Sequence, residues 1–176
     1  MNPFLGNERF FLIAGPCALE SEENVLYLSK RIKDITDRLG INYCFKVSWD
    51  KANRTSVTKY RGPGIDEGMR ILKKVKAENN VMIATDIHES WQAKIVAEVA
   101  DIIQIPAFLC RQTDLIEAAA RTGKVIIFKK ELWTEYGRRI GFHPYIQEVG
   151  EIEGVDIDTM EDLKVAQALA GHVLNL

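Results

Sequence analysis

The sequence has few cysteines, almost no net charge and no long apolar run, and each of these features excludes a class of protein. Cys17, Cys44 and Cys110 are odd in number and widely separated, which argues for reduced thiols and against a disulfide framework. The formal net charge of −2 gives no basic excess of the kind that binds nucleic acid. No run reaches transmembrane length, and residues 1–17 lack a cationic segment followed by an apolar core of signal-peptide length. We therefore expect a cytoplasmic protein with no nucleic-acid or membrane partner.

Short apolar runs alternate with helical patterns along most of the chain. The apolar runs predict five buried strands, at residues 10–14, 42–47, 81–85, 101–104 and 125–128. Apolar residues spaced by three and four predict the intervening helices, at residues 21–39, 66–77, 90–99 and 113–121, with Ser21 as the first cap. The alternation of strands and helices predicts a parallel α/β sheet with right-handed crossovers, buried on both faces.

Polar residues stand where each predicted strand ends. They are Cys17 after the first strand, Lys46 and Ser48 after the second, Asp86 and His88 after the third, Gln104 at the fourth, and Lys129 and Lys130 at the fifth. Parallel strands bring their carboxyl ends to one edge, where ligands bind in barrels and open sheets alike. The cationic balance of this edge predicts a mouth that binds phosphate and carboxylate groups.

The segment after the second strand, residues 45–64, reads FKVSWDKANRTSVTKYRGPG. It brings cations together with hydroxyl and amide groups, which suits an anionic, hydroxylated small molecule. These residues are Lys46, Lys51, Asn53, Arg54, Thr55, Ser56 and Arg61.

Several motifs of the sequence resemble those of 3-deoxy-D-manno-octulosonate 8-phosphate synthases. The motifs are IAGPCALES at 13–21, FKVSWDKANRTS at 45–56, YRGPG at 60–64, TDIHESWQA at 85–93 and DIIQIPAFLCRQTDL at 101–115. The resemblance implies the (β/α)8 TIM-barrel fold and condensation of phosphoenolpyruvate with arabinose 5-phosphate, in lipopolysaccharide sugar synthesis. The word KANR favours this family over the related heptulosonate synthases that use erythrose 4-phosphate, whose loop resembles KPRTS. A complete barrel needs roughly 250 residues, so the 176 residues predict a truncated barrel of about five βα units.

The resemblance also implies which residues meet the substrates. Lys46, Ser48, Lys51, Gln104, Pro106, Ala107 and Lys129 match positions that surround phosphoenolpyruvate, and Asn53, Arg54 and Thr55 match positions that hold arabinose 5-phosphate. The family usually has serine at position 55, and threonine keeps the hydroxyl. We expect Lys46, Lys51, Asp86 and His88 to be the catalytic residues.

Cys17 has two interpretations. A cysteine after a strand is ordinarily a small core residue. In the family, however, cysteine at this position marks the metal-dependent class, so the resemblance implies that Cys17 is a ligand of Fe, Zn or Mn. The family completes that site with histidine, glutamate and aspartate from later strands, and no match to these follows Lys130. Since a site with one ligand binds metal weakly, we expect little or no turnover.

Residues 131–176 resemble the C-terminus of acylneuraminate cytidylyltransferases in the words YGRRIG and VDIDTMED. We therefore divide the chain into a partial synthase barrel, residues 1–130, and a strand–helix tail, residues 131–176. Asp156 and Asp158 match magnesium-binding positions of that second family. The basic nucleotide-binding loop is missing, so we expect these carboxylates to be structural, near a strand at 144–149 and a helix capped by Asp158 or Thr159.

Three hypotheses remain open from the sequence. The first is a synthase that binds phosphoenolpyruvate and arabinose 5-phosphate. The second is a cytidylyltransferase-related enzyme, which predicts magnesium-dependent CTP binding. The third is a non-catalytic module that oligomerises, because a five-stranded sheet leaves its first and fifth strands as open edges. In the first hypothesis, too, the edges predict a homo-oligomer.

Overall fold

The computed structural model describes residues 11–53, 58–128 and 160–173. The chain divides into two compact units, Met1–Tyr145 and Ile146–Leu176. All five predicted strands and all four predicted helices of the barrel portion lie in the first unit.

The first unit contains a five-stranded parallel sheet whose strand order follows the sequence. Its strands are β1 (Phe11–Ala14), β2 (Asn42–Lys46), β3 (Met82–Asp86), β4 (Ile102–Gln104) and β5 (Val125–Ile127). Each strand pairs with the next in parallel register, so that Lys46 is paired with Ala84 and Asp86 with Gln104. Five sequential parallel strands with alternating helices form half of a (β/α) barrel, which confirms the predicted fold class.

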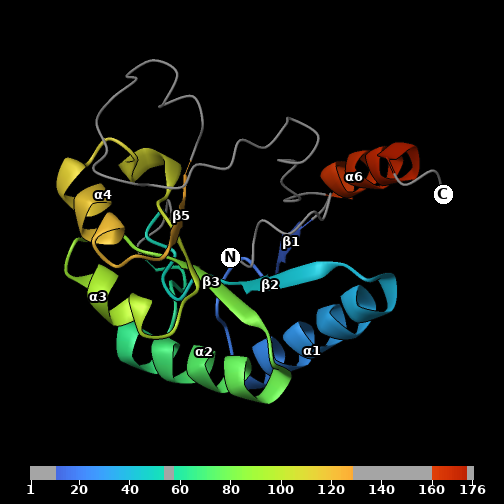
Figure 1. Cartoon of the computed structure of the whole chain (residues 1–176), viewed down its shortest axis with the longest axis horizontal. Coiled ribbons are helices and arrows are strands. Elements are labelled where there is room, and N and C mark those ends of the chain that lie inside the picture. Colours follow the sequence, from blue (N-terminus) through green and yellow to red (C-terminus); the bar gives the residue numbers. More distant parts are fainter. Residues whose placement is uncertain (1–10, 54–57, 129–159, 174–176) are drawn as a thin grey trace. The chain divides into compact units, whose positions relative to one another are not determined.

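The helices α1 (Glu22–Leu39), α2 (Ile65–Asn79), α3 (Gln92–Ala97) and α4 (Thr113–Ala120) form an arc outside the strands (Figure 1). As predicted, α1 begins after Ser21, whose hydroxyl accepts a hydrogen bond from the Asn24 amide at 3.2 Å. The third helix is shorter than the predicted 90–99, because the chain passes through turns at Glu89–Gln92 and Ser90–Ala93 before regular helix begins. A short 3₁₀ helix, η1 (Ala107–Leu109), follows β4.

The sheet has two apolar faces of different character. The outer face packs against the helices in the main core, which includes Phe45, Ile83 and Ile103, all fully buried. The inner face carries a smaller cluster of Cys44, Ala84 and Ile102, bordered by the partly buried Phe11, Ile13, Met82, Val125 and Ile127. Alternate residues of each strand therefore serve different faces, as the pleat requires.

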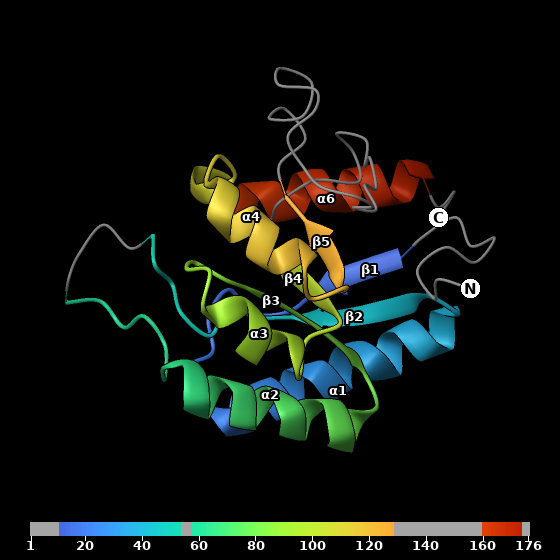
Figure 2. The same cartoon turned by 60° about the vertical axis from the view of Figure 1, so that its left-hand side comes forward.

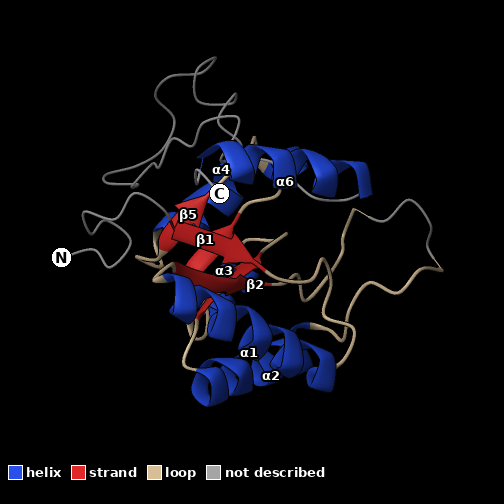
Figure 3. Cartoon of the chain, turned by 90° about the vertical axis from the view of Figure 1, so that its right-hand side faces the viewer, coloured by secondary structure: helices blue, strands red, loops and turns tan. Residues whose placement is uncertain are grey.

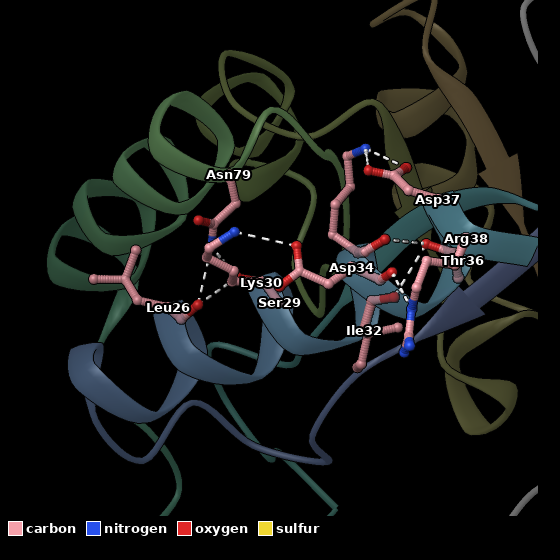
Figure 4. Close-up of polar contacts among 10 residues, drawn as sticks. Leu26, Ser29, Lys30, Ile32, Asp34, Thr36, Asp37, Arg38 and Asn79 are labelled. Carbon is pink, nitrogen blue, oxygen red and sulfur yellow. Dashed lines mark hydrogen bonds and ion pairs between the residues drawn. The ribbon is translucent and has the colours of Figure 1, made fainter.

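Helices α1 and α2 lie side by side next to the strands (Figure 3), and a buried polar clamp joins them (Figure 4). The Asn79 side-chain amide at the end of α2 donates to the Leu26 carbonyl at 2.9 Å and to the Ser29 hydroxyl at 2.5 Å. Ser29 is fully buried and itself donates to the Leu26 carbonyl at 3.1 Å. These bonds satisfy the polar groups that packing the two helices would otherwise leave unpaired.

The second unit contains one described element, the helix α6 (Met160–Val173). This confirms a helix in the tail, whereas its predicted cap, the strand at 144–149, and Asp156 and Asp158 lie outside the described residues. None of the described helices is long and apolar enough to cross a membrane.

Candidate active site at the carboxyl ends of the strands

A chain of polar contacts, buried at Ser48 and Asp86 and half-buried at Lys46 and His88, connects the ends of β2 and β3. The Lys46 ammonium donates to the Ser48 hydroxyl at 3.3 Å, and Ser48 donates to Asp86 Oδ2 at 2.8 Å. His88 Nε2 lies 3.6 Å from the same carboxylate oxygen. The structure therefore brings together four of the residues that the sequence placed in the site, from two neighbouring strands.

The local folding of the chain explains this meeting. β2 and β3 are adjacent and parallel, so the residues that follow them emerge at the same edge. Gly15, just after β1, approaches so closely that a Cβ there would lie 2.0 Å from the Lys46 carbonyl oxygen. Ala18 then pairs with Ser48, and the Leu19 amide donates to the Ser48 carbonyl at 2.9 Å. The loop after β1 thus packs directly against the end of β2.

The Asp86 carboxylate is charged although it is nearly buried. Burial alone would raise the pKa of Asp86, but its contact with His88, the positive charge of Lys46 and the Ser48 hydrogen bond together hold that pKa below its ordinary value. Among the described residues, Asp86 Oδ1 and His88 Nδ1 are buried without a hydrogen-bond partner. Two unpaired buried polar atoms in one cluster are costly, and they are typical of a site that meets a ligand or water.

The segment between β2 and α2 extends away from the sheet (Figure 2), and its two ends are tied together. The Lys51 amide donates to the Arg61 carbonyl at 2.7 Å, and the Arg61 guanidinium forms two hydrogen bonds with Asp50, at 2.8 and 2.6 Å. Arg61, which the sequence suggested as a ligand-binding cation, is therefore already neutralised by Asp50. Lys51 is half-buried near the base of the segment, and Asn53 is exposed.

The remaining predicted substrate residues are only partly described. Gln104 is half-buried at the end of β4 and Pro106 is buried, while Ala107 is exposed at the start of η1. The Gln104 carbonyl accepts from the Ile87 amide at 3.2 Å, which joins its strand end to the segment that carries His88. The other three, Arg54, Thr55 and Lys129, lie outside the described residues.

The three cysteines differ in environment. Cys17 is exposed after β1, so the core role that a cysteine there ordinarily has does not apply. Cys44 and Cys110 are buried, as expected of packing residues. Burial, with a smaller effect from Asp101, raises the pKa of the Cys44 thiol and keeps it protonated. In the described part of the chain, no group of three or more histidine, cysteine, aspartate or glutamate side chains is placed to hold a metal ion.

Two residues of the cluster were not singled out from the sequence. The indole N–H of Trp49 donates to the Asp86 carbonyl at 2.8 Å, and the Gln92 side-chain oxygen accepts from the His88 and Glu89 amides at 2.7 and 3.2 Å. Both side chains are buried. An apolar aromatic and an amide carry no catalytic signature, so only the three-dimensional contacts reveal them.

A five-stranded half-barrel of β/α units defines a protein of the β/α-barrel class, and its lysine, hydroxyl and carboxylate lie at the edge where ligands bind in that class. The model of the DAHP synthetase I family matches residues 4–150. The chain therefore belongs to the DAHP synthetase I family.

Curated relatives share extensive identity with this chain. The 2-dehydro-3-deoxyphosphooctonate aldolase of Fusobacterium nucleatum is 61% identical over 127 residues, which cover 72% of this chain and 46% of the relative. The 2-dehydro-3-deoxyphosphooctonate aldolase 1 of Arabidopsis thaliana is 57% identical over 129 residues, or 73% of this chain and 44% of the relative. The 2-dehydro-3-deoxyphosphooctonate aldolase of Cyanothece is 57% identical over 121 residues, which cover 69% of this chain and 44% of the relative. The chain spans slightly less than half the length of these relatives, and the predicted octulosonate phosphate synthase resemblance is confirmed as homology.

Proposed function

We propose that this chain carries the phosphoenolpyruvate-binding half of a 3-deoxy-D-manno-octulosonate 8-phosphate synthase, acting in lipopolysaccharide sugar synthesis. The observation that carries the proposal is the partly buried Lys46–Ser48–Asp86–His88 cluster at the carboxyl ends of β2 and β3. The identity of more than half of the aligned residues with aldolases named for this product supports it.

The reaction joins two substrates at this edge. C3 of phosphoenolpyruvate adds to the aldehyde of arabinose 5-phosphate, water adds at C2, and phosphate leaves with cleavage of its C–O bond. In our proposal the carboxylate and phosphate of phosphoenolpyruvate are held by cations and polar groups from four strand ends. These are Lys46, Ser48, Lys51, Gln104, Pro106, Ala107 and Lys129.

The chemistry assigned to the cluster follows from its charges. Asp86 is ionised and is linked through Ser48 to Lys46, so the Lys46 ammonium has a fixed direction and a balanced charge. A lysine held in this way stabilises the charge that develops as the phosphate leaves. In our proposal His88, which lies 3.6 Å from Asp86, holds or passes a proton. Asn53, Arg54 and Thr55 are proposed to hold the aldose phosphate.

A divalent metal, Fe, Zn or Mn, is the cofactor that Cys17 would ligate. The described residues do not fit this role by themselves, because Cys17 is exposed and no group of three or more possible ligands surrounds it. The proposal for the chain alone is binding of phosphoenolpyruvate with little or no turnover.

Calorimetric titration of the purified chain with phosphoenolpyruvate tests this function. We expect binding that weakens at least about tenfold in Lys46→Ala, because a hydrogen bond between charged groups contributes about 1.5–3 kcal/mol. Lys30→Ala is the matched control, since Lys30 is exposed and pairs with Asp34 on α1. No binding by the wild-type chain, or equal binding by Lys46→Ala, contradicts the proposal.

We also propose that the protein is a cytoplasmic homo-oligomer. The low net charge and reduced-thiol pattern support the compartment. The partly buried apolar inner face of the sheet supports association.

The tail, residues 131–176, carries the second candidate function. The words YGRRIG and VDIDTMED favour descent from a cytidylyltransferase C-terminus. We do not propose magnesium at Asp156 and Asp158, and titration with CTP and Mg²⁺ checks this: measurable binding would favour the cytidylyltransferase hypothesis. Absence of any ligand affinity would favour the third hypothesis, a non-catalytic module.

A further inference from the structure

Trp49 contacts both members of the carboxylate–imidazole pair in the candidate site. It is 4% exposed, and its indole N–H donates to the Asp86 backbone carbonyl at 2.8 Å. Its ring also meets the His88 imidazole edge to face, with the centroids 5.9 Å apart and the planes at 63°. One side chain that follows β2 therefore contacts both Asp86, at the end of β3, and His88, just after it.

Hydrogen bonds constrain the imidazole of His88 only weakly. His88 Nδ1 is buried with no hydrogen-bond partner among the described residues, and Nε2 lies 3.6 Å from Asp86, beyond normal hydrogen-bond distance. The Gln92 side chain holds the backbone amide of His88 but not its ring. The orientation of the ring therefore depends on packing, and the indole of Trp49 supplies the ring contact.

Helix α2 makes room for the indole. A Cβ on Gly68 would lie 2.8 Å from Trp49 Cβ, a separation that real side chains do not adopt. Glycine at this position allows α2 to pack directly against the base of the Trp49 side chain, which restricts its position.

We propose that Trp49 is a positioning residue. Its indole N–H holds the Asp86 backbone carbonyl and its ring packs against the His88 imidazole, so that both side chains face the anion-binding edge. Gly68 is part of the same device, because it lets α2 hold Trp49 in place. The proposal rests on the proposed function only in its kinetic consequence. Its structural content, one fixed orientation of His88, is independent of which ligand the site takes.

The experiment compares Trp49→Phe with Trp91→Phe in the full chain. Phenylalanine keeps an aromatic ring but loses the N–H that reaches Asp86. Trp91 is a matched control. It lies between His88 and the start of α3, but it is 55% exposed and its indole N–H donates to Glu89. The readout is the set of His88 ring signals in NMR spectra, assigned among the three histidines with His88→Asn.

We expect one narrow set of His88 ring signals in the wild-type chain and in Trp91→Phe, and broadened or doubled signals in Trp49→Phe. A changed ring current would only move a narrow signal, so broadening separates lost positioning from a mere change of neighbour. Gly68→Ala, which displaces the indole without altering it, should give the same broadening. A single narrow His88 set in both Trp49→Phe and Gly68→Ala overturns the proposal.

If the variants fail to fold, NMR measurements on the wild-type protein still test the proposal. Cross-relaxation between the Trp49 and His88 rings, together with slow exchange of the Trp49 indole proton, is expected in the unmodified chain. Absence of both also overturns the proposal. Where the chain turns over, Trp49→Phe should lower kcat about tenfold with little change in KM. A wild-type chain that binds no phosphoenolpyruvate but shows the expected NMR signature would count against the proposed function and leave the positioning role established.

Discussion

At the scale of single residues, Asp86 is the group on which the site's electrostatics depend. Its pKa is held below the ordinary value of 3.8, so the folded state binds a proton less readily than the unfolded chain. This carboxylate therefore contributes stability at neutral pH. That contribution is lost as the pH falls from about 3.8 through the lower pKa of the folded state.

The corresponding prediction concerns Asp86→Asn. At pH 7 the variant should lose about 1–3 kcal/mol of unfolding free energy, because Lys46, Ser48 and His88 are left without their charged partner. Below the folded-state pKa the two proteins should converge. Denaturant unfolding at pH 7 and at the lowest pH where both remain folded measures the difference. A difference that does not shrink with falling pH would contradict the assignment.

Ser48 provides a second prediction at this scale. Ser48→Ala removes both the acceptor for Lys46 and the donor to Asp86. We expect the pKa of Asp86 to rise and phosphoenolpyruvate binding to weaken about threefold to tenfold, since one buried hydrogen bond contributes about 0.5–1.5 kcal/mol. Calorimetry gives the affinity and carboxyl NMR signals give the direction of the pKa change. An unchanged affinity would remove Ser48 from the site.

Sequence reasoning predicted that the polar residues at the ends of β2 and β3 lie together, but it did not predict the residues that contact them. Lys46, Ser48, Asp86 and His88 were predictable because parallel strands must deliver their ends to one edge. Trp49 follows the same strand but reads as an ordinary core aromatic, and its role depends on a contact with Asp86 across 37 residues of sequence. Such pairing over a long separation has no local pattern from which to predict it.

At the scale of elements, the clamp between α1 and α2 carries stability without touching the site. Asn79→Ala removes the bonds to Leu26 and Ser29 and leaves a fully buried hydroxyl with fewer partners (Figure 4). We expect a loss of about 1–3 kcal/mol in the free energy of unfolding, with unchanged phosphoenolpyruvate binding. Lys30→Ala, on the exposed face of α1, should stay within about 0.5 kcal/mol. Reduced ligand binding in Asn79→Ala would show that the clamp also supports the site.

The elements themselves were largely predictable, and the one clear difference has a local cause. Apolar periodicity fixes the existence and type of strands and helices within a few residues, as for β3 and α2. The third helix begins later than predicted because Gln92 turns inward to bind the His88 and Glu89 amides, which holds the preceding residues in turns. The hydrogen bonds of the Gln92 side chain have therefore shortened a helix that the apolar pattern would extend.

At the scale of the whole molecule, the inner face of the sheet predicts how copies of the chain associate. Within residues 11–128 this face has Cys44, Ala84 and Ile102 buried, but Met82 and Val125 only partly covered. Covering such a face is favourable by about 25 cal/mol for each Å² of apolar surface removed from water. We expect sedimentation to show species whose masses are multiples of 19.9 kDa, with the average mass increasing as the protein concentration rises.

Placing a charge on that face should prevent association. Val125→Lys introduces a cation into the partly covered cluster, and burying it unpaired costs several kcal/mol, so we expect the monomer to dominate. Ile35→Lys is the control, because Ile35 is exposed on α1 and away from the sheet's inner face. The control should sediment like the wild-type chain. Equal sedimenting masses for the wild-type chain and Val125→Lys would mean that any association uses another surface. A wild-type chain that stays monomeric at all concentrations would contradict the proposed oligomer itself.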